Sequence, residues 1–130
     1  MSHHREPITA IGAPAAIGPY AHAIRSGGLL FCSGQLPLDP NSGEIVSDGY
    51  GEQATQCLEN LRAVCAAAGA ELRDAVKLTV YVTEMGAFAE INEAYADFFS
   101  SDPPARAVVG VAELPKSARV EIDAIVALPD

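Results

Sequence analysis

One stretch near the C-terminus constrains the fold more than any other part of the chain. Residues 103–126 read PPARAVVGVAELPKSARVEIDAIV, a pattern that predicts two β-strands joined by a short turn at residues 114–117. Each strand carries a charge among apolar neighbours, Arg106 at the start of the first and Glu121 near the start of the second. If the two strands pair as a hairpin, the guanidinium and the carboxylate face one cavity.

Alternation assigns the two faces of the last strand, because successive side chains along a strand point to opposite sides. One face is apolar and the other is largely charged: Val120, Ile122, Ala124 and Val126 alternate with Arg119, Glu121, Asp123 and Ile125. The apolar face is predicted to lie in the core beneath helices. Buried charges cost several kcal/mol unless they are paired, so the charged face has two interpretations. It is an intersubunit salt-bridge network, for example Arg119 with Glu121 or Asp123, or a polar pocket at a subunit boundary with Arg106 as the anion anchor.

The rest of the chain supplies three more strands and two helices. After an irregular lead-in over residues 1–19, periodicity and turn residues predict strands at 21–26, 29–33 and 76–83 and helices at 49–68 and 86–99. The predicted order is β-β-α-β-α-β-β. We therefore expect an α+β fold, a mixed β-sheet with two helices packed on one face. We also expect a single domain over residues 1–130, with a symmetry mate covering the other sheet face.

Composition and charge exclude several classes of function. The chain has 130 residues, with eight Lys or Arg against 17 Asp or Glu, and a net charge of −9. Nucleic acids and membrane surfaces bind clustered basic residues, and those here are scattered, so neither partner is expected. No apolar run is long enough to cross a membrane, and no signal-peptide pattern opens the chain. Three cysteines without CxxC spacing argue against disulfides and zinc, so we expect a cytoplasmic protein without metal or cofactor.

Four further residues are candidates for a pocket, each with a structural alternative. Tyr20 follows Gly-Pro, whose constrained backbone helps to aim the phenol, or it is a surface or edge aromatic. Asn92 lies at the border of the buried stripe of the second helix, where its amide caps a loop or reaches a ligand. Gly34 marks a bulge or a close backbone approach, and Ser33 lacks the surroundings of a catalytic serine. His22 is expected to have only a packing or surface role.

Arg106 and Glu121 together suggest a reaction class. An arginine fork can hold a carboxylate through two parallel N–H bonds, each contributing about 1.5–3 kcal/mol. A carboxylate side chain nearby can hold or deprotonate a water, which is typically worth about 10²–10⁴ in rate. Without metal or cofactor motifs, this pair fits the addition of water to a reactive small acid.

The chain closely resembles the RidA (YjgF) family of enamine/imine deaminases, essentially from end to end. The matching stretches, in this order and spacing, are APAAIGPY at 13–20, SGQLP at 33–37, INEAY at 91–95, PAR at 104–106, ELPK at 113–116 and VEI at 120–122. The resemblance implies a chorismate-mutase-like fold and a homotrimer with three pockets at subunit boundaries. It also implies hydrolysis of 2-aminoacrylate and related 2-imino acids to 2-keto acids and ammonia.

Carried over residue by residue, the resemblance implies a role for each candidate. Arg106 binds the substrate carboxylate, and Glu121 positions or activates the attacking water. The pocket lining, which hydrogen-bonds substrate or water and allows close approach, consists of Tyr20, Ser33, Gly34 and Asn92. A neighbouring subunit supplies the far wall of this pocket.

Two departures from the family pattern leave the preferred imine side chain open. Pro103 stands where the family commonly has an aromatic residue, and Val108 stands where many members carry a cysteine. If position 108 acts through its backbone, valine is harmless there. Two alternatives also remain, a binding or chaperone-like trimer that senses a 2-keto acid without turnover and a pathway-specific deaminase of the same family.

Overall fold

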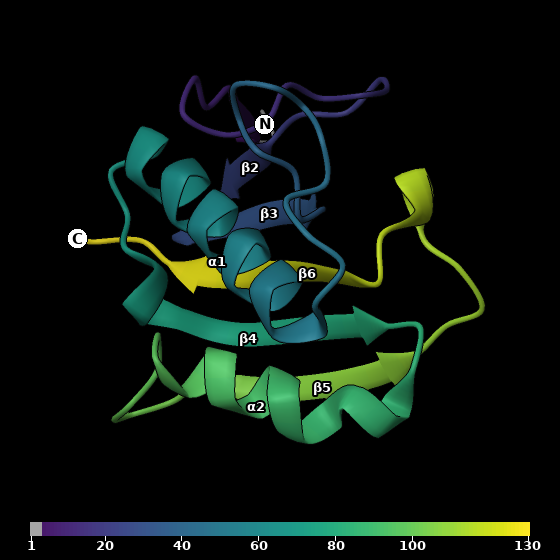
Figure 1. Cartoon of the computed structure of the whole chain (residues 1–130). Coiled ribbons are helices and arrows are strands. Elements are labelled where there is room, and N and C mark those ends of the chain that lie inside the picture. The colour runs from purple at the N-terminus through teal and green to yellow at the C-terminus, as the bar shows by residue number, and fades with distance from the viewer. Residues whose placement is uncertain (1–3) are drawn as a thin grey trace.

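The computed structural model describes residues 4–130, which form a six-stranded sheet with two α-helices against it (Figure 1). The strands are β1 (Glu6–Ile8), β2 (Ala23–Ser26), β3 (Leu29–Gln35), β4 (Ala75–Val82), β5 (Ala105–Gly110) and β6 (Val120–Ala127). The helices are α1 (Tyr50–Ala67) and α2 (Phe88–Ala96), and three short 3₁₀ turns are η1 (Leu72–Asp74), η2 (Met85–Ala87) and η3 (Pro115–Ser117). The predicted α+β class, a mixed sheet with two helices, is confirmed.

The sequence pattern missed one strand and overestimated one helix. β1 lies inside the lead-in that was predicted to be irregular, and it pairs antiparallel with β2 at the edge of the sheet. Pro7 conceals this strand from a pattern search, although an edge strand tolerates a residue without an N–H donor. The second helix is shorter than predicted, because its first turn is the 3₁₀ turn η2 and its last regular residue is Ala96.

The order of strands in the sheet is β1-β2-β3-β6-β4-β5, and this corrects the predicted hairpin. β5 and β6 do not pair: β4 lies between them, parallel to β5 and antiparallel to β6. The reason is the α2 crossover, which returns the chain beside β4 in the parallel direction and so places β5 at the open edge. The segment from 111 to 119 then spans β4, and β6 enters the centre of the sheet next to β3.

The core lies between the helices and one face of the sheet. The predicted stripe of α1 is buried, and so are the predicted core residues of β6, which are 2 % exposed or less. β4 contributes Leu78, Val80 and Val82 to the same core, all fully buried. Full burial of a Val or Leu side chain contributes about 1.5–3 kcal/mol, so these central strands and α1 hold most of the fold together.

Two local features near β3 follow the sequence prediction. Gly27 and Gly28 connect β2 to β3 with φ angles of 60° and 82°, the left-handed pair that a two-residue hairpin turn requires. The pairing of β3 with β6 shifts register between Cys32 and Gln35, so the chain bulges at Gly34 as expected. The bulge lies beside β6 at the level of the candidate pocket.

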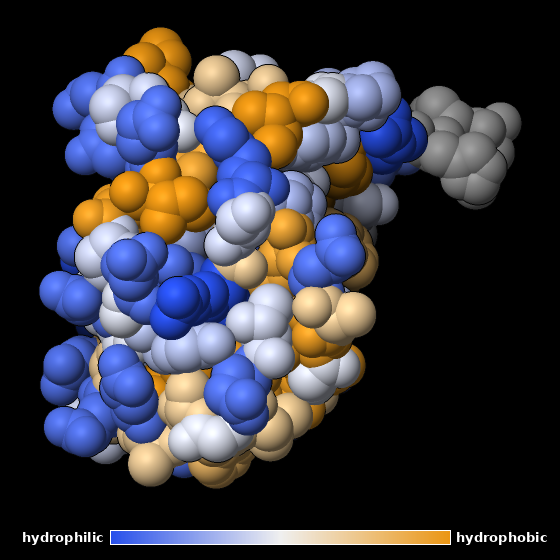
Figure 2. Space-filling model, turned by 45° about the vertical axis from the view of Figure 1, so that its right-hand side comes forward, coloured by the Kyte–Doolittle hydropathy of each residue, from blue (hydrophilic) through white to orange (hydrophobic). Residues whose placement is uncertain are grey.

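The other face of the sheet is only partly covered within one chain. Phe31 on β3 is 42% exposed, and Leu29, Tyr81 and Ile125 are half-buried on the same face. The face of the molecule shown in Figure 2 is mixed, with apolar residues in separate patches among hydrophilic ones. Within residues 4–130, no helix is both long and apolar enough to span a bilayer.

Candidate active site

Arg106 is fixed on the helix side of the sheet. It lies opposite Leu78 in the parallel β4–β5 ladder, so its side chain starts from the same face as that buried leucine. Its Nη1 donates a hydrogen bond to Oδ1 of Asn92 on α2, at 2.8 Å. The guanidinium carbon lies 4.7 Å from the ring centre of Tyr95 and 5.6 Å from that of Phe88. Two aromatic faces and an amide therefore hold the cation in one orientation.

Asn92 reaches the site through Arg106. It lies one turn after Phe88 on α2, and its carbonyl oxygen is the acceptor of the arginine hydrogen bond. The amide hydrogens of Asn92 stay available for a ligand carboxylate that approaches the same guanidinium. Of the two sequence interpretations, reaching a ligand is the one that this placement favours over capping a loop.

Glu121 lies in a second group, on the face of the sheet away from the helices. It pairs in register with Tyr81 of β4, whereas its neighbours Val120 and Ile122 are fully buried on the helix side. A cavity of about 280 Å³ opens beside it. The lining residues are Ile17, Tyr20, Ser33, Gly34, Leu36, Pro115 and Glu121. The structure thus brings together four of the six predicted site residues.

The position of the Glu121 carboxylate requires a glycine at residue 34. A Cβ atom built on Gly34 falls far inside contact distance of the Glu121 carboxylate oxygen. The β-bulge brings the bare backbone of Gly34 against this side chain, which confirms the close backbone approach predicted for it. Any larger residue forces the carboxylate out of its position.

Ser33 and Tyr20 are anchored by the backbone of the segment that precedes β2. Ser33 Oγ donates to the carbonyl of Ala21 at 2.6 Å, and its N–H donates to the carbonyl of His22 at 2.9 Å. The Tyr20 hydroxyl accepts from the N–H of Ile17 at 3.3 Å, and the residue is 44% exposed toward the cavity mouth. Both hydroxyls lie at the pocket, and neither has a base that would make it a nucleophile.

His22 has a structural role that the sequence did not reveal. Its Nδ1 accepts a hydrogen bond from the N–H of Ala10 at 2.9 Å, so the ring proton is on Nε2, which donates to the carbonyl of Pro14 at 2.8 Å. The ring is 6% exposed. These two bonds fix the segment that leads to Tyr20. The sequence signal was a histidine two residues after the Gly-Pro-Tyr turn. Such a histidine does not by itself indicate whether its ring hydrogen-bonds the preceding segment or only packs against it.

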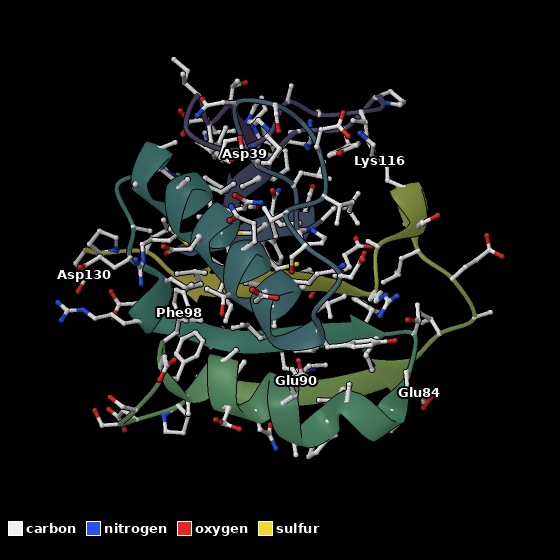
Figure 3. The ribbon with its side chains drawn as sticks, viewed as in Figure 1. Asp39, Glu84, Glu90, Phe98, Lys116 and Asp130 are labelled. Atoms are coloured by element: carbon white, nitrogen blue, oxygen red, sulfur yellow. The ribbon has the colours of Figure 1, made fainter. Side chains whose placement is uncertain are left out.

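The loop that closes the pocket on its other side is also tied down. Lys116, in η3, donates from Nζ to the carbonyl of Gly43 at 2.9 Å, linking this loop to the turn that contains Asp39 (Figure 3). Lys116 and Ser117 both have φ of 58°, a left-handed conformation that non-glycine residues adopt at some cost. This hydrogen bond holds the loop whose Pro115 lies at the cavity wall.

The electrostatic setting of Glu121 raises the pKa of its carboxyl. Burial is the larger cause, and the negative charge of Asp123 is the second. Asp123 in turn accepts a hydrogen bond from the Tyr81 hydroxyl at 3.0 Å, and burial together with this bond raises the pKa of Tyr81. Arg119 does not neutralise the pair within one chain: its guanidinium lies 5.3 Å from the ring centre of Tyr50.

The two groups of candidate residues do not meet in one chain. Arg106 and Asn92 lie on the helix side of the sheet, and Glu121 faces the other side, with β4 between the two strands. The single cavity expected from a hairpin is therefore wrong for an isolated chain. Both positions that depart from the family pattern lie on or next to β5, the strand that carries Arg106. Val108 is half-buried opposite Val80 on the same ladder, and Pro103 is exposed just before β5. Across residues 4–130, no three His, Cys, Asp or Glu side chains gather into a group that could hold a metal ion.

Comparisons with known proteins identify the family of this chain. The family model described as Endoribonuclease L-PSP matches residues 10–128. A RutC family protein of Sinorhizobium fredii, y4sK, is 54% identical over 123 residues, covering 95% of this chain and 98% of its own. The 2-iminobutanoate/2-iminopropanoate deaminase of Mus musculus is 45% identical over 121 residues, covering 93% and 90%.

Solved structures match as closely. RidA from an Antarctic Psychrobacter superposes with a TM-score of 0.91 at 43% identity, covering 95% of this chain and all of its own, 100%. Escherichia coli TdcF with bound serine gives a TM-score of 0.90 at 42% identity, covering 95% and 99%. With a family model that spans almost the whole sequence and relatives at these identities, the chain belongs to the RidA family.

Proposed function

We propose that this protein is a cofactor-free deaminase that hydrolyses small 2-imino and 2-enamino acids, such as 2-iminopropanoate and 2-iminobutanoate, to 2-keto acids and ammonia. The working unit is a homotrimer, and each active site combines the Arg106 group of one subunit with the Glu121 pocket of its neighbour. The protein acts in the cytoplasm, in keeping with three buried cysteines that are free thiols.

The observation that carries the proposal is the placement of Arg106 and Glu121 on opposite faces of one sheet. Each group is half of a site: one holds an anion, and the other holds a proton acceptor in a small cavity. β5 is at the open edge of the sheet, so Arg106 can reach a second copy. That copy packs on the half-covered face, where Phe31 and Tyr81 otherwise contact water.

The chemistry follows from these two groups. Arg106 binds the carboxylate of the substrate and so aligns C2 with the water held by Glu121. The water oxygen bonds to C2 of the iminium while the C=N π pair moves onto nitrogen, and Glu121 accepts one water proton. An enamine first takes a proton from solvent at C3 and so becomes the iminium. No electron acceptor or metal enters this step.

Collapse of the carbinolamine completes the reaction. Glu121 returns its proton to the nitrogen, and the C–N bond then breaks with its electron pair leaving on ammonia. The hydroxyl oxygen becomes the keto oxygen as its proton passes to the carboxylate. The same carboxyl thus acts first as a base and then as an acid, and a pKa above the ordinary glutamate value favours the return of the proton.

The test is keto-acid and ammonia formation from imines generated in the assay by an amino-acid oxidase. We expect the wild type to accelerate hydrolysis over the spontaneous reaction, and Arg106→Ala to lose about 10²-fold or more in kcat/KM. Arg73→Ala is the matched control, because Arg73 is exposed and pairs with Glu71 away from the site. Equal rates for wild type and Arg106→Ala contradict the proposal. Thermal stabilisation by 2-keto acids without any rate enhancement indicates the non-catalytic sensing protein instead.

A mixing experiment tests the shared site. In a trimer that contains both Arg106→Ala and Glu121→Ala subunits, one of the three boundaries has an intact Arg106 facing an intact Glu121. Random assembly therefore restores about a quarter of the wild-type activity, although each variant alone is inactive. A site formed within one chain gives no recovery on mixing.

Ribonuclease activity, which the description of the family model names, is not proposed here. Cleavage of RNA requires binding of a phosphate backbone, and this chain carries a net charge of −9 with scattered basic residues. Arg106, the residue best placed to hold an anion, has an amide and two aromatic rings around it and no second basic residue among these partners.

A further inference from the structure

We propose that Asp123, held in place by Tyr81, is a positioning residue that acts on Glu121 and so allows Glu121 to serve as both base and acid. The inference deepens the proposed function and rests on it for its catalytic consequence. Its physical core, the coupling between two carboxyls on one face of β6, can be measured without substrate.

The geometry is that of a three-residue cluster on two strands. Glu121 and Asp123 are two residues apart on β6, so both side chains leave the same face, roughly 7 Å apart along the strand. Tyr81 of β4 lies in register with Glu121, and its hydroxyl reaches diagonally to Oδ2 of Asp123, at 3.0 Å. All three side chains are half-buried, on the face of the sheet that a second subunit is proposed to cover.

The hydrogen bond fixes the position of Asp123 beside Glu121. The Tyr81 O–H donates to Oδ2 of Asp123. Within residues 4–130, the ion pairs join Arg25 to Glu6, Arg62 to Glu59 and Arg73 to Glu71, so none of them neutralises either carboxyl. Asp123 therefore stays on the same face as Glu121, and its negative charge adds to burial, the larger cause, in raising the pKa of Glu121.

The other groups around Glu121 do not cancel this effect. From α1, Cys57 approaches as a buried thiol whose pKa is raised, chiefly by burial, so it is neutral. Just before β6, Arg119 is directed over Tyr50. On β4, Lys77 lies four residues from Tyr81 on the same face, and no ion pair of the described residues joins it to either carboxyl. From β3 and the pocket wall come the uncharged hydroxyls of Ser33 and Tyr20.

The catalytic consequence follows from what the reaction asks of Glu121. An ordinary glutamic acid is almost fully ionised at pH 7 and returns a proton to nitrogen poorly, whereas a carboxyl with higher proton affinity can both accept and return it. Burial supplies part of the increase and the charge of Asp123 supplies the rest. Asp123 touches no reacting atom in this scheme and acts through Glu121.

The test is a titration of Glu121 in the substrate-free protein, followed by ¹³C NMR of labelled glutamate side chains and assigned with Glu121→Gln. We expect Asp123→Asn, which preserves size, to move the Glu121 midpoint to lower pH by about one unit. The acid limb of kcat/KM against pH moves with it, kcat falls at neutral pH, and KM stays close to the wild-type value. Glu59→Gln removes one exposed negative charge on α1 and is expected to move neither curve.

Tyr81→Phe provides a second variant that keeps both carboxyls and the aromatic ring. Without the hydroxyl, the Asp123 carboxylate is no longer held beside Glu121, so its charge acts on Glu121 less strongly and the Glu121 midpoint moves in the same direction by less. An unchanged Glu121 titration in both Asp123→Asn and Tyr81→Phe overturns the inference. The titration tests the inference and the turnover assay tests the proposed function. A wild type without deaminase activity contradicts the proposed function, whatever the NMR midpoints show.

Discussion

The two halves of the proposed site differ in how completely they are partnered. The Arg106 half is oriented by partners from its own chain, with an amide acceptor at 2.8 Å and two aromatic faces around the guanidinium. The Glu121 half is open: its carboxyl has no ion pair among the described residues and borders a cavity of about 280 Å³. Binding an anion calls for a fixed donor fork, whereas moving a proton calls for a carboxyl that is not neutralised.

The same difference appears in how the fold builds each half. Arg106 depends on one helix and one edge strand, α2 and β5, that are adjacent in the chain. The Glu121 pocket assembles distant segments, among them Tyr20, the bulge at Gly34 and the loop at Pro115. The first half is set by local structure and the second by tertiary packing, so substitutions in the two halves are expected to have separable effects.

Glu121→Gln is the change expected to have the largest effect. Loss of the proton-transferring group lowers kcat by about 10²–10⁴ and leaves KM nearly unchanged, since Arg106 still binds the carboxylate. Single-turnover kinetics with imine generated in the assay measure this. A large rise in KM with unchanged kcat would show that Glu121 binds substrate rather than handling protons.

The same variant has a pH-dependent effect on stability. Because the pKa of Glu121 is higher in the folded state than in the unfolded state, its contribution favours folding when it is protonated and is lost as the pH rises through the folded pKa. Above the folded pKa the ionised carboxyl therefore destabilises the fold, and Glu121→Gln raises Tm there. The difference in Tm shrinks as the pH falls below the ordinary pKa of glutamate. Thermal melts at pH 4 and pH 8 compare the two conditions, and equal differences at both contradict the assignment.

Gly34→Ala comes next, because it displaces Glu121 without altering its chemistry. The added methyl group occupies the place of the carboxylate oxygen, so the side chain rotates away from the water that it is proposed to hold. We expect kcat to fall by about 10–10²-fold with little change in KM. Gly69→Ala is a glycine control away from the site; its φ of 74° predicts a stability loss without a selective loss of kcat. Retained kcat in Gly34→Ala contradicts the close-approach argument.

The sequence predicted the elements of the fold better than their arrangement. Alternation identified the buried face of β6 correctly, since a period of two leaves no choice once one face is apolar. It did not show that β4 separates β5 from β6, because strand order depends on the α2 crossover and the core rather than on the residues of either strand. For this reason Arg106 and Glu121 were both found, yet were placed in the wrong relation within one chain.

His22 illustrates a different limit. Its two hydrogen bonds join Ala10 and Pro14, which are distant from it in the sequence and belong to a segment with no regular structure. Periodicity carries no information about such contacts, and a lone histidine next to a strand is consistent with many roles. Motif resemblance identified Tyr20, and only the folded backbone shows what aims it.

Asn92→Ala and Asn92→Asp test how far the Arg106 half depends on its own partners. Alanine removes one charge-assisted hydrogen bond, worth about 1.5–3 kcal/mol, and we expect KM to rise about tenfold with kcat little changed. Aspartate keeps the acceptor but adds a negative charge that competes with the substrate carboxylate for the guanidinium, so its KM rises further. The KM values, measured beside those of Asn41→Asp on an exposed turn, check this order. A lower KM in Asn92→Asp than in Asn92→Ala contradicts the proposed role.

Tyr95→Phe is expected to have the smallest effect, and it separates the ring of Tyr95 from its hydroxyl. The hydroxyl is buried and has no hydrogen-bond partner among residues 4–130, whereas the ring lies 4.7 Å from the guanidinium carbon of Arg106. Removing an unsatisfied buried hydroxyl leaves stability unchanged or raises it by up to about 1 kcal/mol, and the retained ring keeps KM unchanged. Urea unfolding and steady-state kinetics measure both, with Tyr95→Leu as the variant that loses the aromatic face and raises KM. A clear loss of stability in Tyr95→Phe would mean that the hydroxyl finds its partner across the subunit boundary, and the contrast between a self-contained Arg106 half and an open Glu121 half would then fail.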